Sequence, residues 1–195
     1  MIKSIAVYCG HQFGTNPDFA RDAAKLGELL ARNKFKIVFG GGDVGLMGTV
    51  ATAAVQNGGE VVGVSTHHVV ALQEPAHDEV DVEIVDGVNE RKQKMFELSD
   101  AFCILPGGIG TLNELTDIMT MQQIGESQKP IFFLNTGKYW NIFGQMLVHM
   151  QQDGFIPKME SYDMTVANTP EELMKLIINR KNLGPAGTAT NQFDV

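Results

Sequence analysis

The chain has 195 residues, with 15 Lys and Arg against 23 Asp and Glu, which gives a formal net charge of −8. Hydrophobic residues make up 44% of it and charged residues 19%, proportions that exclude disorder of the whole chain. An acidic balance without a block of Lys and Arg argues against general binding to nucleic acid or to an anionic membrane surface. The composition therefore favours one globular domain that acts on a small molecule.

The two cysteines, Cys9 and Cys103, both lie in apolar runs. Their number and setting argue against a disulfide framework and are typical of a protein in a reducing compartment. The apolar run at the N-terminus holds about seven residues, too few for the core of a signal peptide or for a membrane span. We therefore expect a cytoplasmic protein without a membrane-spanning segment.

Short, partly β-branched apolar segments alternate with helical patterns along the chain. The predicted strands are 5–9, 35–39, 61–64, 80–85, 101–105 and 131–134. The predicted helices are 17–33, 46–56, 89–98, 111–123, 139–152 and 170–180. Strands that are joined by helices run parallel, with right-handed crossovers. The order predicts an α/β fold, a Rossmann-like three-layer α/β/α sandwich with a mainly parallel sheet.

Two segments interrupt this alternation. Residues 65–79 contain a histidine pair among polar residues, which predicts a surface excursion or a short extra helix. Residues 182–195 lack hydrophobic periodicity and are rich in small polar residues, which predicts a flexible tail. The remaining residues, 1–181, show no internal repeat and are assigned to a single domain.

A glycine-rich segment, the first glycine loop (40–48), follows the predicted strand 35–39 and opens the next helix. Glycines allow positive φ angles and let an anion approach the main chain, while the start of a helix presents unpaired N–H groups. The spacing Gly40-x-Gly42-x-x-Gly45 also matches the dinucleotide fingerprint. It follows the second strand rather than the first, which weakens an NAD interpretation. Close packing of the helix against the strand is the alternative explanation of these glycines.

The second glycine loop (106–110) follows the predicted strand 101–105 and opens the helix predicted over 111–123. It forms a second predicted anion cradle, in which the Thr111 hydroxyl caps the helix or donates to a phosphate. Glu114, about one turn into the helix, points toward the same crevice. The alternative for Glu114 is a capping box, since Thr111-x-x-Glu114 is that pattern. Neither loop ends in Lys-Ser or Lys-Thr, which argues against a P-loop NTPase.

A basic turn opens the helix that precedes the second glycine loop. Arg91, Lys92 and Lys94 place three cations within four residues, enough to neutralise a phosphate. A solvated helix face is the alternative for Lys92 and Lys94. Arg91 is therefore the better candidate for a site residue.

Neither a metal nor a cofactor is predicted. His67 and His68 are adjacent at a strand exit and point to opposite sides, and His77 stands apart from them, so no metal cluster is expected. Pyridoxal phosphate chemistry needs an activated lysine. Lys92 and Lys94 lie in a polar turn, which argues against a decarboxylase.

Three segments, 40–48, 90–92 and 106–114, closely resemble motifs of the Lonely Guy (LOG) family, cytokinin-activating phosphoribohydrolases that are often mislabelled lysine decarboxylases. The PGGxGTxxE signature is the central match, and further matches in family order extend the resemblance over roughly residues 5–156. The resemblance implies a homodimeric, Rossmann-like enzyme. Such an enzyme hydrolyses the N-glycosidic bond of adenosine 5′-monophosphate (AMP) or its N6-substituted form and yields the free base and ribose 5-phosphate.

The resemblance also implies the site residues. Arg91 and Glu114 match the arginine and glutamate that the family uses for catalysis. We expect Glu114 to orient or deprotonate the attacking water and Arg91 to hold the phosphate or ribose, while main-chain amides of both glycine loops anchor the phosphate. The expected substrate-binding residues are Gly41, Gly42, Arg91, Lys92, Met95, Gly107, Gly108, Gly110, Thr111 and Glu114.

Several positions depart from the family pattern. They are His11-Gln12-Phe13, Val88-Asn89, Asn113 and Met121. These residues belong to the expected base or ribose side, so the identity of the base and of its N6 substituent stays open. The alternative to a hydrolase is a non-catalytic carrier of a nucleotide or a molybdopterin-type cofactor, which keeps both phosphate cradles but does not need Glu114.

Overall fold

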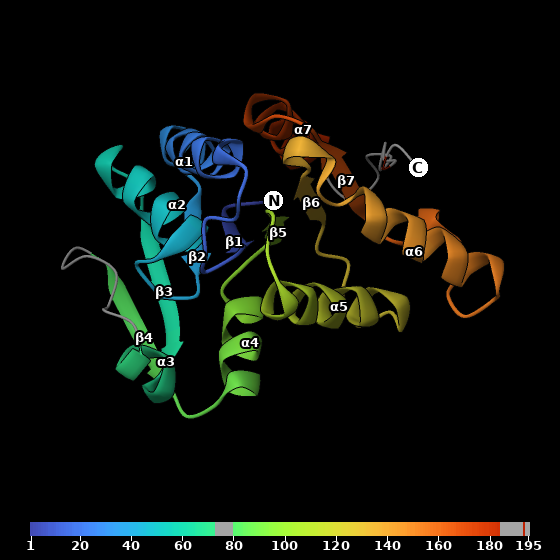
Figure 1. The fold of residues 1–195 in the computed structure, drawn as a ribbon, viewed down its shortest axis with the longest axis horizontal. Coiled ribbons are helices and arrows are strands. Elements are labelled where there is room, and N and C mark those ends of the chain that lie inside the picture. Colours follow the sequence, from blue (N-terminus) through green and yellow to red (C-terminus); the bar gives the residue numbers. More distant parts are fainter. Residues whose placement is uncertain (73–79, 184–192, 194–195) are drawn as a thin grey trace.

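Strands and helices alternate along the chain in the computed structural model, which describes residues 1–72, 80–183 and 193 (Figure 1). The strands are β1 (Ser4–Tyr8), β2 (Lys36–Phe39), β3 (Val61–Thr66), β4 (Asp81–Val85), β5 (Ala101–Ile104), β6 (Ile131–Leu134) and β7 (Met164–Ala167). The helices are α1 (Pro17–Arg32), α2 (Gly45–Gln56), α3 (His67–Leu72), α4 (Val88–Glu97), α5 (Ile109–Gln123), α6 (Asn141–Gln152) and α7 (Pro170–Leu183). Two 3-10 turns, η1 (Thr136–Lys138) and η2 (Met159–Ser161), flank α6.

The strands of the described residues form one parallel sheet of seven, in the order β4-β3-β2-β1-β5-β6-β7. From β1 to β4 the chain adds each strand on the same side of the one before. It then crosses back and places β5 on the other side of β1. The predicted Rossmann-like α/β fold is confirmed.

Helices cover both faces of the sheet (Figure 1). The apolar sides of α1, α2 and α7 pack on one face, and those of α4, α5 and α6 pack on the other. In α1, Ala23, Leu26 and Leu30 recur at helical spacing and are fully buried, while Asn16 caps the helix by accepting a hydrogen bond from the Asp18 N–H at 3.0 Å. Among the described residues, no helix has the length and apolar character that crossing a membrane requires.

Two features of the elements differ from the sequence-based expectation. The pattern does not predict β7, a four-residue edge strand whose Thr165 interrupts the apolar run that marks the inner strands. Helix α5 begins at Ile109, two residues before the predicted start, with Gly108 as its N-cap. Thr111 therefore lies in the first turn of the helix and does not cap it.

The two segments that interrupt the sequence pattern are described in part. Within residues 65–79 the expected short helix is present as α3, and 73–79 lie outside the described residues. Of the predicted tail, 182–195, the structure describes the last two residues of α7 and Phe193. Phe193 is 4% exposed and packs edge-on against Phe133, with ring centroids 5.1 Å apart.

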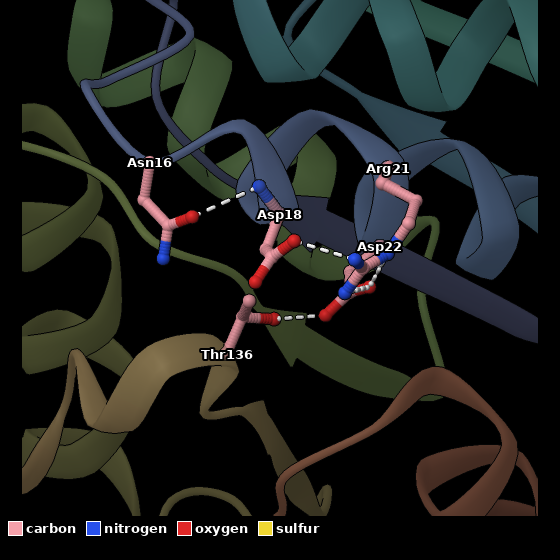
Figure 2. Close-up of polar contacts among 5 residues, drawn as sticks. All are labelled: Asn16, Asp18, Arg21, Asp22 and Thr136. Carbon is pink, nitrogen blue, oxygen red and sulfur yellow. Dashed lines mark hydrogen bonds and ion pairs between the residues drawn. The ribbon is translucent and has the colours of Figure 1, made fainter.

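A buried hydrogen bond joins the corner between β6 and α6 to helix α1 (Figure 2). The Thr136 hydroxyl in η1 donates to Asp22 at 2.8 Å, although the two residues are 114 positions apart. Asp22 is 6% exposed and also accepts from the Arg21 guanidinium at 3.0 and 3.1 Å. The main-chain N–H of Trp140 donates to Asn135 Oδ1 at 2.8 Å and closes the corner itself. These bonds fix the corner relative to α1.

Thr136→Val removes the buried donor while keeping the shape of the side chain. Because a buried carboxylate then loses one of its partners, we expect the free energy of unfolding to fall by about 1–3 kcal/mol in urea denaturation. Thr116→Val is the matched control, since the exposed Thr116 hydroxyl donates only to the main chain of its own helix. We expect the control to change stability by no more than about 0.5 kcal/mol. Equal losses in the two variants would contradict this role of Thr136.

Candidate active site

A cavity of about 530 Å³, the main cavity, lies at the carboxyl ends of β1 and β5. The chain order reverses between these strands, so their outgoing loops diverge and leave a crevice, the usual place for a ligand in an open parallel sheet. The Gly10 N–H donates to the Pro106 carbonyl at 3.0 Å and ties the two loops together where they leave the sheet. The volume falls in the range of small-molecule sites.

The second glycine loop presents an open helix start to the main cavity. Gly108 is the N-cap of α5, and no side chain caps the helix. Within the described residues, the N–H groups of Ile109, Gly110 and Thr111 have no hydrogen-bond acceptor. Gly107 is required here because a Cβ would lie 2.1 Å from the Thr111 hydroxyl oxygen. All five residues line the cavity, and free N–H groups at the positive end of a 15-residue helix can bind an anion.

The first glycine loop serves mainly for packing. The N–H groups of Leu46 and Met47, at the start of α2, donate to the Gly10 carbonyl at 3.1 and 3.3 Å. Gly41 adopts a φ of 79° and packs against β3, and neither Gly41 nor Gly42 is among the residues that line the main cavity. The structure does not bring these two expected binding residues to the site, because their loop turns toward the sheet and the helix start behind it is already occupied.

Gly40 connects the first glycine loop to the site through Arg91. Arg91 Nη2 donates to the Gly40 carbonyl at 3.1 Å, and Arg91 Nε donates to the Val64 carbonyl at 2.8 Å. A Cβ on Gly40 would lie 2.0 Å from Arg91 Nη2, so glycine is needed for the guanidinium to lie here. The Gly40 carbonyl follows β2, and the Val64 carbonyl belongs to β3. Together they hold the guanidinium and leave its Nη1 facing Glu114.

Glu114 and Arg91 meet at the main cavity. Arg91 Nη1 lies 3.5 Å from Glu114 Oε1, and the side chains are only 12% (Glu114) and 15% (Arg91) exposed. Burial raises the pKa of Glu114 to about 7; the charges of Arg91 and Lys92 oppose this rise, and Asp117 adds to it. The carboxyl group therefore exchanges its proton near neutral pH, the range in which a general base works best.

Glu114 does not act as a helix cap. The N-cap of α5 is Gly108, so Glu114 stands six positions beyond it, past the first turn in which the acid of a capping box lies. The capping-box alternative for Thr111 and Glu114 is therefore wrong. The carboxyl group remains available to Arg91 and to a ligand.

Met95 and Lys92 take different places in the site. Met95 is 1% exposed and lines the main cavity. Lys92 lies instead beside a second cavity of about 170 Å³, which shares Glu114 with the first. The Lys92 Nζ contacts Asp117 at 2.6 Å and Asn113 at 2.9 Å. These contacts make Lys92 a link between α4 and α5 and keep it away from the main cavity.

Sequence reasoning did not find Tyr8, Val69 or Tyr139, which also line the main cavity. Tyr139, at the corner before α6, donates its hydroxyl to the Gly107 carbonyl at 2.5 Å. The signal that could have found these residues is position, since each ends or follows a strand at the carboxyl edge of the sheet, where parallel sheets bind ligands. The loop after β1 lines the cavity with three of the departures from the family pattern, His11, Gln12 and Phe13.

The described residues contain no group of three or more His, Cys, Asp or Glu side chains placed to hold a metal ion, and His77 lies outside them. No lysine of the same residues lines the main cavity. The chemistry that this cavity offers is an anion cradle at one end and a buried carboxyl–guanidinium pair beside it.

Solved structures with the same fold include a molybdenum cofactor binding protein from Rippkaea orientalis. It matches with a TM-score of 0.67 and 24% identity, over 92% of this chain and 97% of that one. The molybdenum cofactor carrier protein of Chlamydomonas reinhardtii matches with a TM-score of 0.67 and 18% identity, over 93% of this chain and 99% of that one. At these identities the likeness concerns the fold alone.

Sequence comparison gives the family. A family model described as "Possible lysine decarboxylase" matches residues 47–177. The chain is 39% identical to the cytokinin riboside 5′-monophosphate phosphoribohydrolase of Rhodococcoides fascians over 155 residues, 79% of this chain and 78% of that protein. It is 34% identical to the corresponding Arabidopsis thaliana enzyme LOG7 over 173 residues, 89% of this chain and 80% of that protein. The chain therefore belongs to the LOG family of phosphoribohydrolases.

Proposed function

We propose that the protein hydrolyses the N-glycosidic bond of AMP or N6-substituted AMP, a cytokinin riboside monophosphate, and releases the free base and ribose 5-phosphate. The observation that carries the proposal is the buried pair of Glu114 and Arg91 beside an open helix start. This pair and the cradle belong to one cavity at the switch point of the sheet. They supply a base and an anion site within reach of a single small ligand.

The chemistry of glycosidic cleavage explains the carboxyl group. The C1′–N bond breaks with its electron pair going to the base, and the sugar passes through an oxocarbenium-like state. In its ionised form, Glu114 stabilises that positive charge and takes a proton from the water that attacks C1′, while the departing base takes up a proton. Arg91 holds the Glu114 carboxylate in place and binds the ribose side of the nucleotide.

The second glycine loop accounts for the phosphate. The free N–H groups at the start of α5, with the Thr111 hydroxyl beside them, form the site for the 5′-phosphate. Binding energy from this remote group fixes the anomeric carbon relative to Glu114, which converts affinity into rate. Gly107, Gly108 and Gly110 let the phosphate approach the main chain.

Two other functions fit the site less well. A lysine decarboxylase needs pyridoxal phosphate on a lysine. No lysine of the described residues lines the main cavity, and Lys92, which follows Arg91, is held by Asp117 and Asn113 beside the second cavity. A nucleotide or molybdopterin-type carrier needs the phosphate cradle but no carboxyl group with a pKa near neutrality, so Glu114 favours the hydrolase.

We also propose that the protein is a homodimer and that it is cytoplasmic. Ile142 and Met146 lie one turn apart on α6 and are 78% and 43% exposed, and Ile109 at the start of α5 is 82% exposed. Exposed apolar side chains of this size support an interface. The free cysteines, Cys9 and Cys103, support a reducing compartment.

Light scattering on the purified protein is expected to give about twice the chain mass of 21.3 kDa. Ile142→Glu places a charge in the proposed interface and should shift the protein toward the mass of one chain. A wild-type protein that stays at the single-chain mass at micromolar concentration contradicts the dimer.

Glu114→Gln tests the proposed reaction. With a panel of AMP, isopentenyladenosine monophosphate, GMP and CMP, we expect the wild type to release base from an adenine nucleotide. Since the amide cannot act as a base, kcat of the variant should be lower by a factor of about 10² to 10⁴. The released base is measured by chromatography. Glu126→Gln, at an exposed position after α5, is the matched control and should stay within about twofold. Failure of the wild type to cleave nucleotides that it binds would favour the carrier.

The pH dependence follows from the pKa of Glu114. A folded pKa of about 7, against an ordinary value of 4.5, means that the carboxylate needed for hydrolysis accumulates as pH rises through 7. The same shift makes Glu114 lower the stability of the fold as pH rises from 4.5 to 7, because the unfolded chain loses this proton first.

Carboxyl ¹³C NMR on the free protein should therefore locate a Glu114 titration near pH 7, assigned by its loss in Glu114→Gln. Arg91→Met should raise this pKa and Asp117→Asn should lower it, because the two substitutions remove charges of opposite sign. Saturating-substrate hydrolysis should be faster at pH 8 than at pH 6. A titration at the ordinary value of 4.5, or no response to either substitution, contradicts the assignment.

A further inference from the structure

The second glycine loop receives one side-chain hydrogen bond within the described residues, and it comes from Tyr139. The Tyr139 hydroxyl donates to the Gly107 carbonyl at 2.5 Å. Tyr139 belongs to the corner between β6 and α6, a part of the chain remote in sequence from the loop. It also lines the main cavity, so the bond lies at the edge of the proposed phosphate site.

The bond fixes the direction of a peptide group. In a trans peptide the carbonyl of one residue and the N–H of the next point in opposite directions, and the described residues contain no cis peptide. Holding the Gly107 carbonyl therefore also holds the Gly108 N–H, which is directed away from the Tyr139 hydroxyl. The bond also occupies a carbonyl oxygen that would otherwise repel an anion.

This peptide group has little else to hold it. Glycine stands on both sides of it, and glycine permits rotations that other residues do not. A Cβ at Gly108 would meet nothing within 4 Å, so no packing fixes that side. Thr111 packs closely on the Gly107 side, and within the described residues the Tyr139 bond is the one hydrogen bond that opposes rotation of this peptide plane. The Tyr139 hydroxyl opposes that rotation.

Two neighbouring rings support the Tyr139 side chain, which is 41% exposed. Its ring packs edge-on against Phe19 and Trp140, with centroids 5.6 and 5.1 Å away. The corner that carries it is tied to α1 by the buried bond from Thr136 to Asp22 (Figure 2). The hydroxyl is therefore presented to the loop by a rigid support and loses little freedom on bonding.

We propose that Tyr139 is a positioning residue that holds the second glycine loop in its phosphate-binding form and thereby makes the enzyme select nucleoside 5′-monophosphates over nucleosides. The proposal rests on the proposed hydrolase function for its substrate. It assigns Tyr139 a role through the loop and gives it no part in breaking the glycosidic bond.

Tyr139→Phe removes the hydroxyl and keeps the ring that packs on its neighbours. We expect kcat/KM for AMP to fall about five- to tenfold, as the loss of one hydrogen bond would cause. Hydrolysis of adenosine, which has no phosphate, should keep its kcat/KM. Tyr162→Phe is the matched control, because the Tyr162 hydroxyl donates to Gln123 at 2.6 Å and neither residue lines the main cavity.

Binding measured by calorimetry separates this proposal from the proposed reaction. In the Glu114→Gln background, adding Tyr139→Phe should weaken the binding of AMP and of inorganic phosphate by the same factor. The binding of adenosine should stay unchanged. This binding result supports the role of Tyr139 even if the wild-type protein hydrolyses no nucleotide. The absence of hydrolysis would overturn only the proposed reaction. Equal weakening of AMP binding and adenosine binding, or unchanged AMP binding, would overturn the role of Tyr139.

Discussion

The parallel pairing of β1 with β5 is the constraint on which the site depends. Strands β2 to β4 extend the sheet on one side of β1 and β5 to β7 extend it on the other, so the loops after β1 and β5 must part. The crevice between them becomes the main cavity because their glycines allow close approach: a Cβ on Gly107 would lie 3.0 Å from the Gly10 nitrogen. Every group of the proposed site reaches this crevice from the carboxyl edge of the sheet or from a helix start beside it.

The two glycine loops are similar in sequence and have different roles in the structure. At the first loop, the Gly10 carbonyl takes the N–H groups of Leu46 and Met47, and the glycine at position 40 makes room for Arg91. At the second loop, the N–H groups at the start of α5 have no acceptor in the part of the chain that the structure describes. One loop thus positions the cation that faces Glu114, and the other offers the proposed anion site. The difference arises from which carbonyl lies opposite each helix start.

Much of this arrangement follows from the sequence because it is local. The apolar runs predict six of the strands, and the spacing from Gly107 to Glu114 places a carboxyl group just inside a helix that begins at a glycine loop. What escapes prediction depends on tertiary contacts. Strand β7 is short and lies at an edge, where Thr165 breaks the apolar pattern. The contact of Lys92 with Asp117 and the hydroxyl bond from Tyr139 join elements whose approach is set by packing of the whole sheet.

The buried carboxyl group is the central feature of the proposed site. Its environment raises the pKa of Glu114 to about 7, and the guanidinium 3.5 Å away keeps the ionised form accessible. Incubation with AMP in ¹⁸O-labelled water, followed by mass spectrometry of the sugar product, tests most directly whether water attacks the anomeric carbon in this site. We expect free adenine together with ribose 5-phosphate that carries one label. Bound AMP that stays intact, or a sugar phosphate released without label at early times, would contradict the proposed reaction.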